Sequence, residues 1–235
     1  MNNNNNNNKD IIKGIECLSV YFMLYLFSPF IIKLLPIDIE TLKQPNNELL
    51  FNIGYELFML IIIFLILKDT IINDFKIFTK YFTKFIKGYI KYWFIALGLM
   101  MISNLIILIF TKDIAQNEQS VRQLVKVNPI LSIFLASVLA PLLEEFLFRL
   151  SLYKILNKYK WLFIILSGLI FGSMHVLPTA NNITDYLFLI PYSIPGSIFA
   201  YTLYKSKNIF VPISLHFIHN TASIIIQIIA LSIIL

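Results

Sequence analysis

Long apolar stretches separated by short polar segments dominate this sequence. About 20 consecutive apolar residues is the length that an α-helix needs to cross the hydrocarbon core of a bilayer. Hydrophobic residues make up 58% of the 235-residue chain and charged residues 14%, whereas soluble domains carry about 25% charged residues. We therefore expect an all-α fold, a polytopic bundle of transmembrane helices.

The apolar stretches predict about seven spans, separated by loops that include Pro36–Glu48 and Thr111–Val127. The spans are about Ile11–Leu35, Leu49–Leu67, Tyr92–Phe110, Asn128–Asn157 and Trp161–Leu177, a sixth that follows the loop Thr179–Asp185 and ends near Tyr204, and Ile209–Leu235. Pro191, Pro195 and Gly196 should kink the sixth span, where neighbouring helices can satisfy the freed carbonyls. With the N-terminus inside, 14 Lys and Arg residues lie on the inner side and 5 on the outer side. The positive-inside rule therefore predicts a cytoplasmic N-terminus.

Two segments near the first spans have a distinctive composition. Asn2–Asn8 contains no apolar residue to bury, so residues 1–10 are expected to form a disordered, Asn-rich tail. Between positions 68 and 91, lysines recur at steps of three or four, opposite aromatic and aliphatic residues. These lysines are Lys76, Lys80, Lys84, Lys87 and Lys91. The pattern predicts an interfacial amphipathic helix over 68–91 with its lysines towards anionic lipid; an extension of the next span fits the same pattern.

The remaining composition restricts the class of partner and the location. The net charge of +6 does not indicate nucleic acid, because the lysines fall between apolar stretches as membrane topology requires. Cys17 is the one cysteine, so we expect no disulfide framework and no cysteine-based metal site. The abundance of Ile, Asn and Lys is typical of an AT-rich genome. We therefore expect an integral protein of a bacterial plasma membrane.

Three ionisable residues interrupt the fourth apolar stretch within six positions: Glu144, Glu145 and Arg149. Glu145 and Arg149 are four apart and lie on one helical face, so they can form an ion pair. Glu144 points about 100° away from Glu145. A charge inside a bilayer costs at least ~2.5 kcal/mol, and a structural ion pair accounts only for Glu145 and Arg149. Glu144 is therefore a candidate functional residue.

The three histidines also lie in apolar stretches, at positions 175, 216 and 219. His216 and Asn220 are four apart and share a helical face. Counted from the neighbouring turns at about 1.5 Å per residue, Glu144 and His175 lie ~21–23 Å deep, Asn220 lies about 18 Å deep, and His216 is ~6 Å shallower. These four side chains can therefore meet at one level of the bundle. A lone histidine in a membrane span more often forms a hydrogen bond between helices. That role does not explain three histidines together with Glu144 and Asn220.

The ordered motifs resemble those of a known family. Glu144-Glu145-x-x-x-Arg149, Phe171-x-x-x-His175 and His216-x-x-x-Asn220 occur in that order in successive apolar stretches. In this respect the chain is similar to the CPBP intramembrane proteases, which include CAAX prenyl endopeptidases and the bacteriocin-processing and immunity-linked proteins also called Abi. The resemblance covers about 128–223. It implies a catalytic core there. Residues 11–127 show no motif of the family and hold the transmembrane helices that their apolar stretches predict, and 224–235 form the end of the last span.

The resemblance implies hydrolysis of a peptide bond inside the membrane, in a membrane-associated protein or peptide. In the family pattern Glu144, together with His175, activates a water. His216 and Asn220 hold the oxyanion of the tetrahedral intermediate. A carboxylate in a medium of low dielectric is a better base near neutral pH, and preorganised donors there stabilise a developing charge strongly. The residues therefore suit the implied chemistry.

The resemblance also implies that Glu145 and Arg149 pair and fix the helix that carries Glu144. We expect no cofactor, but zinc is the alternative. Two histidines and a carboxylate, with water in the fourth position, form an ordinary catalytic zinc shell. Glu144, His175 and His216 could supply these ligands, although the sequence contains no H-E-x-x-H helix.

Two non-enzymatic functions are compatible with the sequence. A scaffold, or a bacteriocin-immunity or regulatory protein of the same family, could keep the motifs and bind a partner without cleaving it. A transporter could relay protons through buried glutamates and histidines. The sequence shows no internal repeat for a transporter, and its polar groups gather at one level and not along a path. The intact set of motifs favours the protease.

Overall fold

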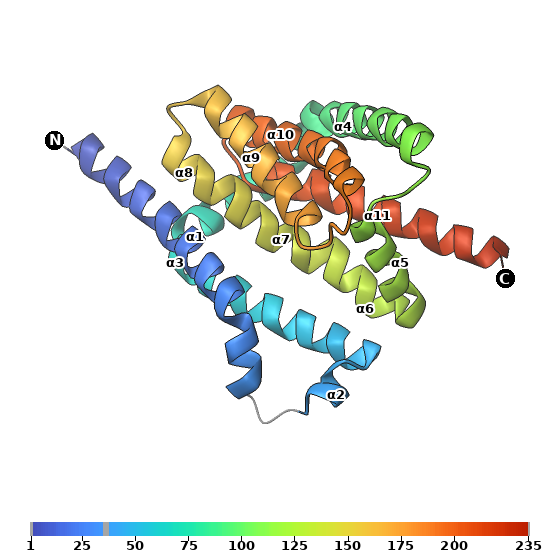
Figure 1. Ribbon diagram of the computed structural model, residues 1–235. Coiled ribbons are helices and arrows are strands. Elements are labelled where there is room, and N and C mark those ends of the chain that lie inside the picture. Colours follow the sequence, from blue (N-terminus) through green and yellow to red (C-terminus); the bar gives the residue numbers. More distant parts are fainter. Residues whose placement is uncertain (1, 35–37, 235) are drawn as a thin grey trace.

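The computed structural model describes residues 2–34 and 38–234 (Figure 1). All regular secondary structure in these ranges is helical, in agreement with the predicted all-α fold. Leu35 and Leu235, the expected ends of the first and last spans, lie outside the described residues, as does Pro36 at the start of the first expected loop.

The helices follow one another with few residues between them. In chain order they are α1 (Asn2–Leu34), α2 (Ile39–Leu42), α3 (Pro45–Lys80), α4 (Phe82–Thr111), α5 (Gln116–Val127), α6 (Pro129–Ile133), π-helical η1 (Phe134–Leu139), α7 (Ala140–Glu145), π-helical η2 (Phe146–Ser151), α8 (Leu152–Leu156), α9 (Lys160–Val176), 3-10 helix η3 (Ile183–Phe188), α10 (Leu189–Ser206) and α11 (Phe210–Ile234). From Pro129 to Leu156 the segments join into one continuous helix.

Six helical stretches of the described chain are long and apolar enough to cross a membrane, and the protein is an integral membrane protein. The fifth expected span corresponds to α9, an apolar helix of 17 residues that is shorter than the other six. At 1.5 Å per residue α9 is roughly 26 Å long, slightly less than the hydrocarbon core of about 30 Å. The total of seven spans and the cytoplasmic N-terminus stay predictions.

The Asn-rich start of the chain differs from the prediction. Asn2–Asn8 are helical and form the beginning of α1, where the sequence predicted a disordered tail. The physical reason is the cooperativity of helix formation: once the apolar part of α1 has nucleated the helix, each further residue adds a hydrogen bond at small cost.

The lysine-rich stretch is not a separate helix. The second span continues to Lys80 and α4 begins at Phe82, with Tyr81 in a hydrogen-bonded turn between them. No glycine or proline occurs between Gly54 and Gly88, so nothing in the sequence ends the second helix at its last apolar residue. All five lysines of the stripe are exposed. Their contact with anionic lipid stays a prediction.

The expected loop Thr111–Val127 contains the helix α5. The segment is polar overall, which is why the prediction missed it, but Val121, Leu124 and Val125 recur at helical spacing. Val125 is buried and Leu124 packs against buried residues of α3 and η1. Helix α5 is therefore an amphipathic helix docked on the bundle.

The continuous helix Pro129–Leu156 is the centre of the bundle (Figure 1). Its segments contact α1, α3, α9, α10 and α11. Every residue from Glu145 to Ser151 is buried, and Leu147 and Phe148 belong to the largest apolar cluster together with Phe163 of α9. The middle of this helix is thus shielded from lipid by other helices.

Helices α9 and α10 cross closely at glycines. A Cβ on Gly168 would lie 2.9 Å from the carbonyl oxygen of Ser193, and a Cβ on Gly196 would lie 3.0 Å from the Cα of Gly168. Small residues allow helix backbones to approach in this way in membranes. The crossing holds the end of α9 against the beginning of α10.

Gly168→Val is expected to lower the thermal stability of the protein in detergent. The added side chain must push the α10 backbone away, and such overpacking typically costs 1–3 kcal/mol, so we expect a loss of about that size. Gly98→Val is the matched control, because a Cβ at Gly98 of α4 meets nothing within 4 Å. Equal unfolding temperatures for the two variants would contradict the close crossing.

Candidate active site

A buried ion pair lies in the central helix. Arg149 Nε is 3.3 Å from Glu145 Oε2, and both side chains are 0% exposed, as their i, i+4 spacing predicts. The other oxygen of Glu145, Oε1, lies 2.9 Å from Nδ1 of His216 on α11. The guanidinium carbon of Arg149 lies 4.1 Å from the ring centroid of Phe171 on α9, a cation–π contact. The pair therefore connects the central helix to α9 and α11.

Glu144 lies between two imidazole rings. Its Oε1 is 3.8 Å from Nε2 of His175, and its Oε2 is 3.7 Å from Nε2 of His216. Both separations exceed a direct hydrogen bond. Glu144 Oε2 is buried and has no hydrogen-bond partner among the described residues. The structure thus brings together three of the four residues that the depth count placed at one level.

Each imidazole is held through its other nitrogen. Nδ1 of His175 lies 3.0 Å from the carbonyl oxygen of Phe171, and Nδ1 of His216 faces the Glu145 carboxylate. A carbonyl oxygen only accepts hydrogen bonds, so His175 carries a proton on Nδ1. Its Nε2 is then free to accept a hydrogen bond from a water, and the Glu144 carboxylate, which is itself an acceptor, can accept the second hydrogen of the same water.

Asn220 contacts the central helix at a carbonyl that a proline leaves free. The N–H of Ala140 bonds to the carbonyl of Leu135 in the i→i−5 pattern of η1. The next donor in that pattern would be residue 141, but Pro141 has no N–H. Nδ2 of Asn220 donates to the carbonyl oxygen of Ala136 instead, at 2.7 Å. Asn220 is thereby fixed to the central helix one turn of α11 beyond His216.

Glu56 is a charged residue near the site that the sequence analysis missed. It lies on α3, and the charge of Glu144 acts on it. One of its carboxylate oxygens is buried without a hydrogen-bond partner among the described residues. The signal was present, because Glu56 is the one Asp, Glu, Lys, Arg or His between Glu48 and Lys68, and a charged residue of this kind within a span indicates function by default.

The third histidine of the chain, His219, lies apart from Glu144. His216 acts electrostatically on it, and its Nδ1 has no hydrogen-bond partner among the described residues. Of the three histidines, only His175 and His216 form ion-pair contacts with Glu144 within the described parts of the chain.

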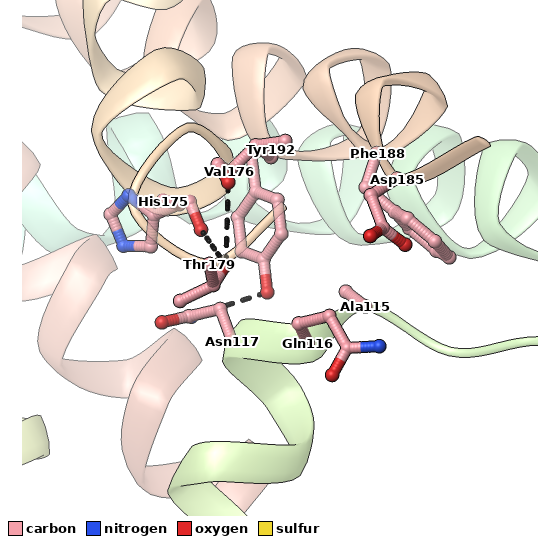
Figure 2. Close-up of a pocket in the computed structure, with 9 residues that line it drawn as sticks. All are labelled: Ala115, Gln116, Asn117, His175, Val176, Thr179, Asp185, Phe188 and Tyr192. Atoms are coloured by element: carbon pink, nitrogen blue, oxygen red, sulfur yellow. Dashed lines mark hydrogen bonds between the residues drawn. The ribbon is translucent and has the colours of Figure 1, made fainter. Parts of the chain in front are cut away.

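A small pocket lies beside His175, between the end of α9, the start of α5, and η3 and α10 (Figure 2). The ring of Tyr192 stacks on the imidazole of His175 with 5.0 Å between centroids and 24° between planes. The hydroxyl of Tyr192 accepts a hydrogen bond of 3.2 Å from Nδ2 of Asn117. Neither residue carries a sequence signal, since both types are common and they lie 75 positions apart.

The donors at the site are of the types that bind zinc. Glu144, His175 and His216 offer a carboxylate and two imidazoles, as catalytic zinc sites do. Within residues 2–34 and 38–234, His, Cys, Asp and Glu side chains form no preformed group of three around a metal position. The choice between the metal-free and the zinc mechanism stays a prediction.

Comparisons with known proteins agree with the motifs. Residues 126–222 match the family described as type II CAAX prenyl endopeptidase Rce1-like. Over 115 residues the chain is 30% identical to a curated protein of Bacillus subtilis (strain 168) named "Putative membrane peptidase YdiL". The alignment covers 48% of this chain and 43% of that protein, so the chain matches less than half of the relative's length. No solved structure matches the chain.

Arg149→Ala is expected to destabilise the protein strongly, because a buried carboxylate left without its partner costs about 3–5 kcal/mol. The yield of folded protein and the thermal midpoint in detergent measure the effect. Arg122→Ala is the matched control: Arg122 pairs with Glu118 at the same i, i+4 spacing but is 50% exposed, and such pairs contribute about 0.3–0.5 kcal/mol. Equally small effects of both changes would show that the buried pair does not support the fold.

Proposed function

We propose that the chain is an intramembrane endopeptidase, because its motifs and both matches support a protease of the CPBP family. The observation that carries the proposal is the Glu144 carboxylate, which faces Nε2 of His175 and of His216 across 3.8 and 3.7 Å. A carboxylate and an imidazole that face one another beyond direct hydrogen-bond distance can together polarise a water, which is a general-base arrangement. The substrate is a peptide bond of a membrane-associated protein or peptide, since the site lies inside a bundle of apolar helices.

Hydrolysis begins with a water held between Glu144 and His175. Glu144 takes a proton from this water while the oxygen attacks the carbonyl carbon of the peptide bond, and the new C–O bond leaves negative charge on the carbonyl oxygen. The proton on Glu144 then passes to the leaving nitrogen as the C–N bond breaks. The products are a carboxylic acid and an amine, and Glu144 returns to its carboxylate form.

The oxyanion is stabilised by His216 and Asn220. Asn220 uses one amide N–H to contact Ala136, and a side-chain amide has a second N–H to offer the oxyanion. His216 is oriented by Glu145, whose position Arg149 fixes in turn. Donors that are fixed before the reaction stabilise developing charge without reorganisation, which is often the largest catalytic contribution.

Glu144→Gln and His175→Ala are expected to lower cleavage of a quenched fluorogenic membrane peptide at least 10²-fold, since general-base groups contribute about 10²–10⁴-fold. Both variants should insert and accumulate like the wild type. Glu48→Gln is the control, because Glu48 is exposed at the start of α3. Near-normal turnover of Glu144→Gln would refute the general base. A wild type that binds the peptide without cleaving it would favour the scaffold function.

Chelation tests the metal-free mechanism. Exhaustive chelation is expected to leave the rate unchanged, and metal analysis should find far less than one zinc per chain. His216→Ala should retain metal-independent turnover, because loss of one oxyanion donor costs about 10²–10³-fold. Stoichiometric zinc in the wild type, lost together with all activity in His216→Ala and in chelated enzyme, would establish the zinc mechanism instead.

A further inference from the structure

The imidazole of His175 lies between two aromatic rings. Its centroid is 4.4 Å from that of Phe171, on its own helix, and 5.0 Å from that of Tyr192 on α10. The ring of Phe171 also carries the cation–π contact with Arg149. Tyr192 differs from Phe171 because it comes from another helix and lies outside the three motifs.

The hydrogen bond of His175 alone does not fix its ring. Nδ1 is held by the carbonyl of Phe171, but a ring held at one atom can still rotate about that contact. His175 is also the second-last residue of α9, and Pro178 follows shortly after, so its backbone lies at a helix end. A stacked ring restricts the plane of the imidazole, and with it the direction of Nε2 towards Glu144.

Tyr192 is itself fixed from a third helix. Its hydroxyl points away from α10 towards Asn117 at the beginning of α5 (Figure 2), and Nδ2 of Asn117 donates to it at 3.2 Å. Phenylalanine would stack equally well on an imidazole, so packing alone does not require the hydroxyl. The hydroxyl sets how the tyrosine ring lies over His175.

We propose that Tyr192 is a positioning residue for His175 and that Asn117 orients Tyr192. The inference rests on the proposed function, in which Nε2 of His175 holds the attacking water. The two residues act through the imidazole and touch neither the water nor the peptide bond. Their loss therefore changes the rate of the chemical step and leaves substrate binding unchanged.

The experiment compares kcat and KM of purified variants on the fluorogenic peptide. Tyr192→Leu is expected to lower kcat about 10–100-fold with KM within twofold, because a displacement of about 1 Å at a catalytic group can cost 10²-fold. Tyr192→Phe and Asn117→Ala should each lower kcat by a smaller, similar factor. The double variant should be no slower than the slower of the two single variants. Both changes remove the same hydrogen bond, and the effects of two changes on one interaction are not additive.

Tyr201→Leu is the matched control. Tyr201 also lies on α10 and also forms an aromatic pair, with Tyr92 at 5.4 Å between centroids, but it does not contact the site. Its kcat should equal that of the wild type. Additive effects of Tyr192→Phe and Asn117→Ala, a wild-type kcat in Tyr192→Leu, or a rise in KM at unchanged kcat would each overturn the inference while the proposed function stands.

A second measurement decides the inference without any cleavage. Diethyl pyrocarbonate acylates unprotonated imidazole nitrogens, and mass spectrometry measures the rate at His175 relative to His219 in the same chain. Tyr192→Leu should raise this ratio several-fold because the imidazole loses its stacked cover, and Tyr201→Leu should not change it. An unchanged ratio in Tyr192→Leu overturns the inference, whereas a wild type that cleaves no peptide overturns the proposed function alone.

Discussion

The buried ion pair between Glu145 and Arg149 is the interaction on which the rest of the site depends. Two charges removed from water require excellent geometry and further partners to offset their desolvation. Those partners are Phe171 of α9 and His216 of α11. The same contacts that make the pair tolerable inside the bundle therefore fix three helices relative to one another. They also direct Nε2 of His216 towards Glu144.

The central helix departs from α-helical geometry on both sides of the two glutamates. The π-helical segments η1 and η2 flank α7, which carries Glu144 and Glu145, and π-helical turns occur frequently at functional sites. The register of η1 and the missing N–H of Pro141 together release the carbonyl of Ala136, which Asn220 then contacts. A backbone irregularity thus provides the polar group that attaches α11 to the central helix.

The sequence predicted the helices and the meeting of Glu144, His175 and His216, because both follow from lengths along helices. Hydropathy reports burial in lipid, and the rise per residue converts position into depth. The prediction of a separate helix over 68–91 was wrong, whereas the alternative, an extension of the next span, agrees with the start of α4 at Phe82. Helix α5 was missed. These boundaries depend on packing, which weak local signals do not reveal. The partner of Asn220 could not be predicted either, since it depends on the i→i−5 register of η1. The stacking of Tyr192 on His175 depends on how closely α9 and α10 cross.

The part of the chain before the family match also contributes to the site. The match begins at residue 126, yet Glu56 of α3 interacts electrostatically with Glu144 and Asn117 of α5 donates a hydrogen bond to Tyr192. Helix α5 is fixed in turn by Gln227 of α11, whose Nε2 donates to Glu118 at 2.9 Å. Residues 126–222 alone would keep the motif residues but would lack both contacts. Because Glu56 interacts electrostatically with Glu144 and Asn117 bonds to Tyr192, substitutions in the first half of the chain can alter the surroundings of the site while every motif residue stays the same.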